Sequence, residues 1–155
     1  MTQPDGPPDP AGVIQLEIEW TVRAPRERVW EALVGEVAAW WPADFYCLGR
    51  PARMILEPHV GGRLYEDAGG AALLWATVLL FDPPATIAFA GNLLPPWGGP
   101  ATTLWRLTLE SVSGPATLLR LNDHVFGRVD ERLRTNLELG WRQLFECGLK
   151  GYVEP

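Results

Sequence analysis

Residues 57–67, EPHVGGRLYED, place two adjacent glycines between two short runs that can each form a strand. A glycine loop that cradles a phosphate is followed directly by a helix, whose free N–H groups bind the anion. Here residues 63–66 have the alternating character of a strand instead. The stretch therefore predicts a turn that needs a positive φ at glycine and joins two antiparallel strands.

Strand-like runs continue on both sides of this turn, separated by segments rich in proline and glycine. Several carry apolar residues on both faces, which suits a sheet covered by a helix on one side. The runs are ARMILEP (52–58), ALLWATVLLF (72–81), ATIAFAGN (85–92), ATTLWRLTLES (101–111) and TLLRLNDHVF (117–126).

The first ordered segments are a separate strand and two short helices. In VIQLEIEWTVR (13–23) apolar and polar residues alternate, which predicts a strand with one buried face. APRERVWEALV (24–34) predicts a helix with Pro25 in its first turn. A second short helix over residues 36–41 ends before Pro42, because the residue before a proline resists helical angles.

Residues 129–152 predict one long amphipathic helix of about six turns. Gly140 and Gly148 each cost about 1 kcal/mol relative to alanine in a helix. We therefore expect close approach to the sheet, or room for a bound molecule, beside them. Antiparallel strands followed by one long helix predict an α+β domain in which the helix closes a curled sheet.

The order of these landmarks resembles the helix-grip fold of the START/birch-pollen-allergen (SRPBCC) superfamily. The chain is similar to the branch named after the C-terminal domain of the activator of heat-shock protein 90 ATPase. The resemblance implies a curved antiparallel sheet of about seven strands, two short helices after the first strand, and a long C-terminal helix over the sheet. It also implies a cavity for lipids, polyketides or other apolar molecules. The matching segments span about residues 13–153 and are APRERVWEAL, the Trp40-Trp41 pair, EPHVGGRLYE, FDPPATIAF, TLLRLNDHVFG and LELGWRQLFECGLKGYVE.

The composition excludes some classes of function. The formal charge is −6 and Lys150 is the single lysine, so we expect no nucleic-acid partner. No apolar stretch approaches about 18 residues and the N-terminus lacks signal-peptide features, so we expect no membrane span and a cytoplasmic location. Residues 1–11 are proline-rich and are interpreted as a disordered tail before a single domain over residues 12–155. Cys47 and Cys147 are interpreted as free thiols, with a disulfide between them as the alternative.

The run 117–126 contains a candidate polar site. Asp123 and His124 are adjacent, so a strand turns them to opposite faces and they cannot act as a pair. If Asp123 faces the interior it needs a partner, and Arg106 on the preceding strand is the expected one. This pair would orient the polar end of a ligand or serve the structure alone.

The sequence carries no recognisable motif for a metal, a cofactor or a nucleophile. Neither His59 nor His124 belongs to a metal-ligand spacing, and no GxSxG is present. We therefore expect no metal and no cofactor, and we assign no catalytic residues. Acid–base chemistry on a bound molecule would fall to Tyr65, Arg106, Asp123 or His124.

The eight tryptophans are the most informative feature for function, because each can form a large, stiff wall. Trp97 lies in LLPPWGGP, a loop that cannot itself be core, and is a candidate lid or interaction site. The predicted walls of a cavity are Trp75, Trp105 and Trp141, with Phe89, Leu137 and Leu144 nearby and Arg106 and Asp123 as polar anchors.

These features predict a protein that binds a small hydrophobic molecule between its sheet and its C-terminal helix. Two alternatives remain: a co-chaperone-like interaction module with a filled interior, and an enzyme of the polyketide cyclase or hydrolase type. A roomy interior favours binding or catalysis, whereas a filled interior argues against both. A homodimer and a protein partner are left open.

Overall fold

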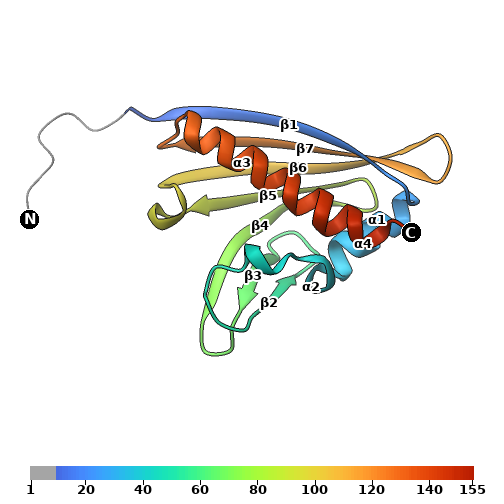
Figure 1. Ribbon diagram of the computed structural model, residues 1–155, viewed down its shortest axis with the longest axis horizontal. Helices are drawn as coiled ribbons and strands as arrows, with labels where there is room; N and C mark the ends of the chain where they lie inside the picture. Colours follow the sequence, from blue (N-terminus) through green and yellow to red (C-terminus); the bar gives the residue numbers. More distant parts are fainter. Residues whose placement is uncertain (1–9) are drawn as a thin grey trace, which may run out of the picture.

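The computed structural model describes residues 10–155, which form a seven-stranded antiparallel sheet and a long C-terminal helix (Figure 1). The strands follow the order β1-β7-β6-β5-β4-β3-β2 across the sheet, so β1 and β2 are its edges. This arrangement confirms the helix-grip α+β fold that the sequence predicts. The strands are β1 (Gly12–Val22), β2 (Arg53–Leu56), β3 (Arg63–Asp67), β4 (Ala72–Asp82), β5 (Thr86–Leu93), β6 (Ala101–Val112) and β7 (Ala116–Gly127).

The alternation in the first strand sets which side chains enter the core. Every second residue of β1, from Ile14 to Val22, is buried, and the residues between them are exposed or partly exposed. β1 pairs with β7 over its whole length, with Leu16 opposite Asp123. The inner face of the sheet is therefore continuous from β1 into β7.

Short helical segments connect β1 to β2 along the chain. These are α1 (Arg26–Gly35), α2 (Val37–Trp40) and the 3₁₀ turn η1 (Ala43–Phe45). Glu66, buried on β3, accepts hydrogen bonds of 2.8 Å from the backbone N–H groups of Cys47 and Leu48, which fixes the segment that leads to β2. Cys47 and Cys147 are both free.

The stretch 57–67 is a turn between two antiparallel strands, as the sequence predicts. Gly61 has φ +83°, which a side chain rarely adopts. A Cβ on Gly62 would lie 2.0 Å from the Glu57 carbonyl oxygen, so only glycine fits there. Glu57 accepts a 2.7 Å hydrogen bond from Arg63 across the turn, and this pair lowers the pKa of Glu57 to about 2. His59 is exposed.

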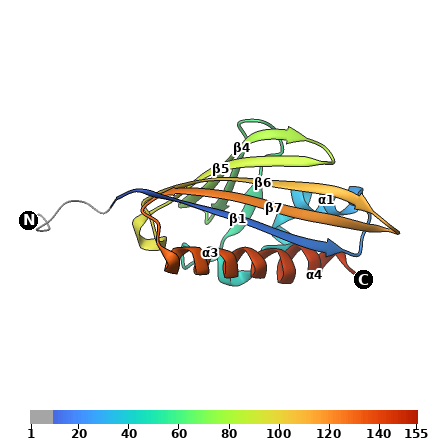
Figure 2. The same cartoon turned by 90° about the horizontal axis from the view of Figure 1, so that it is seen from above.

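The C-terminal helix lies along one face of the sheet, as Figure 2 shows. It consists of α3 (Glu131–Gln143), a π-helical segment η3 (Leu144–Lys150) and the last turn α4 (Gly151–Val153). The sequence predicts one regular helix, so the π-helical segment is a difference. A Cβ on Gly148, within η3, would lie 3.0 Å from the Trp40 carbonyl oxygen, whereas one on Gly140 would meet only Phe45 Cε1 at 4.0 Å. The close approach at Gly148 is therefore to α2 and not to the sheet, while Gly140 has free space beside it.

The core has two parts. The larger part joins α1, α2 and η3 to the middle of the sheet, and the smaller part lies under the start of α3, around Leu133 and Val125. Among the described residues, Trp141 is the one side chain that packs against both.

Most of the predicted N-terminal tail, residues 1–9, lies outside the described residues. Strand β1 begins at Gly12, just after that tail. Over residues 10–155 no helix has both the length and the apolar character needed to cross a membrane.

Candidate functional site

An aromatic wall covers the middle of the inner face of the sheet. Phe89 on β5 and Trp105 on β6 face each other across the strand pair and stack with ring centroids 4.0 Å apart. Trp141, from α3, packs on Trp105 at 4.9 Å, and Phe145 continues the row at 5.9 Å from Trp141. Alternation along β5 and β6 and helical spacing in the C-terminal helix thus bring three predicted wall residues together.

Asp123 is the polar group of this wall and is fully buried. Asp123, on β7, lies opposite Trp105 of β6, so both side chains point to the interior. His124 is exposed on the outer face. Thr103 Oγ1 donates a hydrogen bond to one carboxyl oxygen, and Trp141 Nε1 donates to the other at 2.8 Å. Burial raises the pKa of Asp123 above its usual range, and the two hydrogen bonds partly oppose that effect.

The predicted pair between Arg106 and Asp123 does not form. Arg106 is exposed and lies opposite Asn122, on the outer face of the sheet. Trp105 and Arg106 are adjacent on β6, so they point to opposite faces and cannot both reach the interior. The prediction that Arg106 is a polar anchor is therefore wrong. Trp141 and Thr103 are the hydrogen-bond partners of Asp123 instead.

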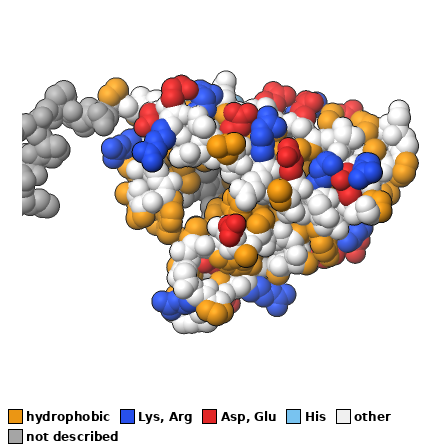
Figure 3. Space-filling model, in the orientation of Figure 1, with side chains coloured by type: hydrophobic (Ala, Val, Ile, Leu, Met, Phe, Trp, Pro, Cys, Tyr) orange, Lys and Arg blue, Asp and Glu red, His pale blue; other side chains and the backbone are white. Residues whose placement is uncertain are grey.

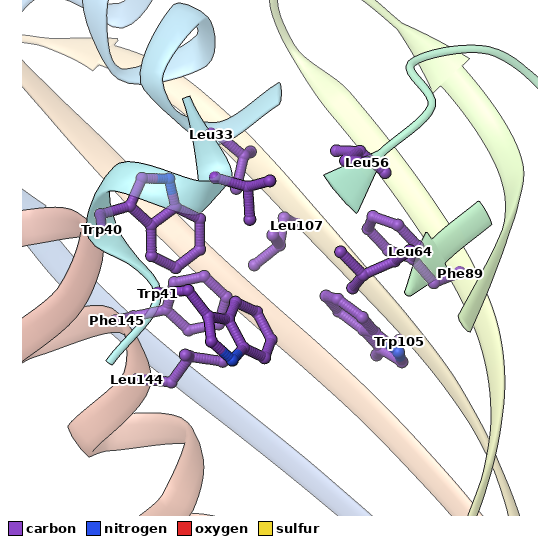
Figure 4. A pocket seen from close by; sticks show the side chains of 11 residues that line it. Leu33, Trp40, Trp41, Leu56, Leu64, Phe89, Trp105, Leu107, Leu144 and Phe145 are labelled. Atoms are coloured by element: carbon purple, nitrogen blue, oxygen red, sulfur yellow. The ribbon is translucent and has the colours of Figure 1, made fainter. Parts of the chain in front are cut away.

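The interior is nearly filled. One cavity of about 20 Å³ lies beside the wall, with Trp41 and Phe145 on one side and Trp105 and Phe89 on the other (Figure 4). That volume holds about one water molecule, whereas ligand pockets commonly reach several hundred Å³. A second pocket, of about 240 Å³, lies between the α1–α2 segment and β2 and is lined by residues 34–39 and 53–56. It contains none of the wall residues, beside which only the small cavity lies. The small cavity is lined by Leu33, Val37, Trp40, Trp41, Leu56, Leu64, Phe89, Trp105, Leu107, Leu144 and Phe145.

The surface is hollowed beside this interior. The hollow lies below α3, between the 3₁₀ turn η2 (Pro95–Trp97) and the β3–β4 part of the sheet (Figure 3). Leu137 and Trp141 pack against the core from α3 but stay half-buried.

Of the remaining predicted residues, Leu144 and Trp75 lie in the interior and Trp97 lies at the surface. Leu144 lines the small cavity, and Trp75 packs edge to face against Trp41 with centroids 5.2 Å apart. Trp97 is 43% exposed in η2. A Cβ on the next residue, Gly98, would lie 3.0 Å from Leu133 Cδ1, so η2 lies against the first turn of α3.

Sequence analysis assigned neither Phe145 nor Thr103 to the site, and it counted Trp41 among the informative tryptophans without placing it in the wall. Thr103 has a detectable signal, because it lies two residues before Trp105 and shares its face. Phe145 directly follows Leu144 in the apolar series of the helix. Trp41 has no such signal, since its position depends on how the α2–η1 segment folds back over the sheet.

The groups considered for acid–base chemistry do not converge. Asp123 alone of the four faces the interior; Arg106 and His124 are exposed, and Tyr65 stacks under the guanidinium of Arg63, 4.6 Å from its ring centroid. Within residues 10–155 no three His, Cys, Asp or Glu side chains are grouped so that they could hold a metal ion.

The sheet order and the helix over the sheet define a helix-grip fold. The family model described as Activator of Hsp90 ATPase homolog 1-like protein matches residues 23–154. The chain belongs to this family. No curated protein matches the sequence significantly.

Solved structures with the same fold cover most of the chain. Protein CV1439 from Chromobacterium violaceum is 23% identical with a TM-score of 0.66, and the match covers 91% of this chain and 97% of that one. Ara h 8.0201 is 14% identical with a TM-score of 0.71, covering 92% and 98%. The anthrahydroquino-γ-pyrone synthase Txn09 is 24% identical with a TM-score of 0.51, covering 70% and 75%. At these identities the likeness concerns the fold alone.

Proposed function

We propose that the protein binds a small hydrophobic molecule between the inner face of the sheet and the C-terminal helix, without a metal or a nucleotide. The observation that carries this proposal is the position of Trp141. It packs against both core clusters, belongs to the aromatic wall, and is only half-buried. Trp141 is the more exposed member of its contact with Trp105, so a molecule that approaches the wall from solvent would contact Trp141 before Trp105.

Binding requires the interior to open, because the cavity beside the wall has a volume of only about 20 Å³. Trp141 Nε1 makes its hydrogen bond to Asp123, and the helix beside it has space at Gly140, where the nearest atom to an added Cβ is 4.0 Å away. Movement of Trp141 away from Trp105 would join the hollow to the cavity. Asp123 would then be the polar end of the binding site.

A titration with the neutral, apolar dye N-phenylnaphthylamine tests this proposal. We expect saturable binding with increased dye fluorescence, and native mass spectrometry of the purified protein would detect any ligand that copurifies. Trp105→Ala and Trp141→Ala should each change the affinity by at least about threefold, which corresponds to the lower part of the range for one lost aromatic contact. Arg106→Ala is the matched control, since Arg106 lies on the outer face and should leave the affinity unchanged. Absence of saturable binding, or equal affinities for all variants, would refute the proposal.

The filled interior favours a second candidate, a protein-interaction module. In that case Trp105, Trp141 and Phe89 are ordinary core, and the exposed Trp97 is the candidate contact for a partner. A folded protein that binds no apolar probe would support this candidate over the first. A homodimer, a cytoplasmic location and catalysis of the polyketide cyclase type remain predictions.

A further inference from the structure

Two tryptophans in the interior have buried indole N–H groups without an acceptor. Within residues 10–155, Trp41 Nε1 and Trp75 Nε1 are both buried and make no hydrogen bond. By contrast, Trp20, Trp40 and Trp141 donate to Glu146, to the Ala32 carbonyl and to Asp123. A third buried nitrogen without a hydrogen bond is Arg26 Nε, at the start of α1, which lies 3.8 Å from a carboxylate oxygen of Glu27.

The two unpaired donors lie in one place. The rings of Trp41 and Trp75 meet edge to face, with centroids 5.2 Å apart and an interplanar angle of 79°. Trp41 also lines the small cavity, opposite Trp105 and Phe89 (Figure 4). Trp75 does not line that cavity, so a molecule that packs on the aromatic wall must extend past Trp41 to reach both N–H groups.

An irregularity in β4 turns the Trp75 side chain toward Trp41. Leu64 pairs with Ala76 and Tyr65 pairs with Leu74, so Trp75 is the extra residue of a β-bulge. Ala76 is buried on the inner face, and without the bulge its neighbour Trp75 would point to the outer face. Bulges that re-aim a side chain occur often beside functional sites.

The chemistry of an indole restricts what can satisfy these groups. An indole N–H donates and never accepts, so its partner must be a hydrogen-bond acceptor. A buried donor without a partner is unfavourable, and a ligand that supplies the acceptor recovers that free energy. A pure hydrocarbon of the same shape gains only the apolar contacts.

We propose that the interior site selects flat aromatic molecules that carry a carbonyl oxygen, which accepts hydrogen bonds from Trp41 and Trp75 while the rings pack against Trp105 and Phe89. This inference rests on the proposed function, since it requires that the interior admits a ligand. It adds the class of ligand and the two residues that recognise its oxygen.

Fluorenone and fluorene form a matched pair of probes, because they share one ring skeleton and differ by a carbonyl in place of a methylene group. Isothermal titration calorimetry of the wild-type protein should give an affinity for fluorenone about tenfold higher than for fluorene, or about 1.4 kcal/mol. In Trp41→Phe and Trp75→Phe, which keep an aromatic ring and lose the N–H, the ratio should fall to about threefold or less. Trp30→Phe is the control, because Trp30 packs on Phe81 away from these donors and should keep the wild-type ratio.

The outcomes separate this inference from the proposed function. If fluorene and fluorenone bind with equal affinity, the interior admits ligands but the carbonyl preference is wrong. If the preference persists in both phenylalanine variants, the assignment to Trp41 and Trp75 is wrong. If neither probe binds, the proposed function and this inference both fail. The wild-type comparison alone remains decisive should either variant not fold, as judged by far-UV circular dichroism.

Discussion

Replacement of Asp123 by asparagine tests whether the buried carboxyl acts as a hydrogen-bonding group rather than as a charge. Asparagine keeps the shape: its oxygen can accept from Trp141 Nε1, and its amide can donate to the Thr103 hydroxyl, which is also an acceptor. Burial raises the pKa of Asp123 in the folded protein, so the folded state binds a proton more tightly than the unfolded state. Wild-type stability should therefore fall as pH rises from the unfolded-state value through the raised folded pKa. Asp123→Asn lacks this loss, and at neutral pH its free energy of unfolding should lie within about 1 kcal/mol of wild type or above it.

The alanine variant supplies the contrast. Asp123→Ala removes both acceptors and leaves the Trp141 N–H without a partner, which costs about 1–3 kcal/mol, and the lost carboxyl volume adds to this. We expect a total loss of about 2–4 kcal/mol, or a Tm lower by roughly 5–15 °C in a domain of this size.

Urea unfolding, followed by far-UV circular dichroism from about pH 4 to pH 8, measures both effects. The reasoning is refuted if Asp123→Asn loses as much stability as Asp123→Ala. A wild-type minus Asp123→Asn difference that stays constant with pH would also contradict it.

Two further predictions concern the C-terminal helix. Gly140→Ala should raise the free energy of unfolding by up to about 1 kcal/mol, because a Cβ there meets nothing closer than 4.0 Å. Gly148→Ala should lower the free energy of unfolding, because its Cβ would lie 3.0 Å from the Trp40 carbonyl oxygen, so urea unfolding of the two variants should give changes of opposite sign. Hydrogen bonds from Lys150 and Arg23 lower the pKa of Glu154 to about 2 from an ordinary 4.5, so its stabilising contribution is complete above the ordinary value and is lost as pH falls toward 2. The stability difference between wild type and Glu154→Gln should therefore be constant near neutral pH and shrink below about pH 4.5; a difference that does not change with pH would contradict the pairing.

The fold could be predicted from the sequence because its signals are local. The period of two in residues 13–23 fixes which side of β1 is buried, and the helical period fixes the inner side of the C-terminal helix. The turn at Gly61 depends only on a positive φ that glycine adopts readily. The bounds of the predicted strands agree with the observed ones to within one or two residues for the four long strands after the turn.

Part of the site could also be predicted in this way. Alternation places Asp123 on one face and His124 on the other, and the structure has this arrangement. The same rule excludes Arg106 from the interior if Trp105 is there, because adjacent residues of a strand point to opposite faces. The position of Arg106 was therefore also predictable from the sequence.

Other features depend on tertiary structure alone. The bulge at Trp75 breaks the alternation of β4, and nothing in the local sequence marks it. The partner of Asp123 is Trp141, which comes from the helix and reaches the carboxyl only after the helix has packed on the sheet. The volume of the interior depends on sheet curvature, on the distance between sheet and helix, and on how closely the side chains pack there. The sequence by itself determined the order of strands and helices and which faces meet, because those follow from short-range periodicity. The tertiary structure decided the hydrogen-bond partners, the unpaired indole groups and the free volume, because these depend on contacts between residues far apart in the chain.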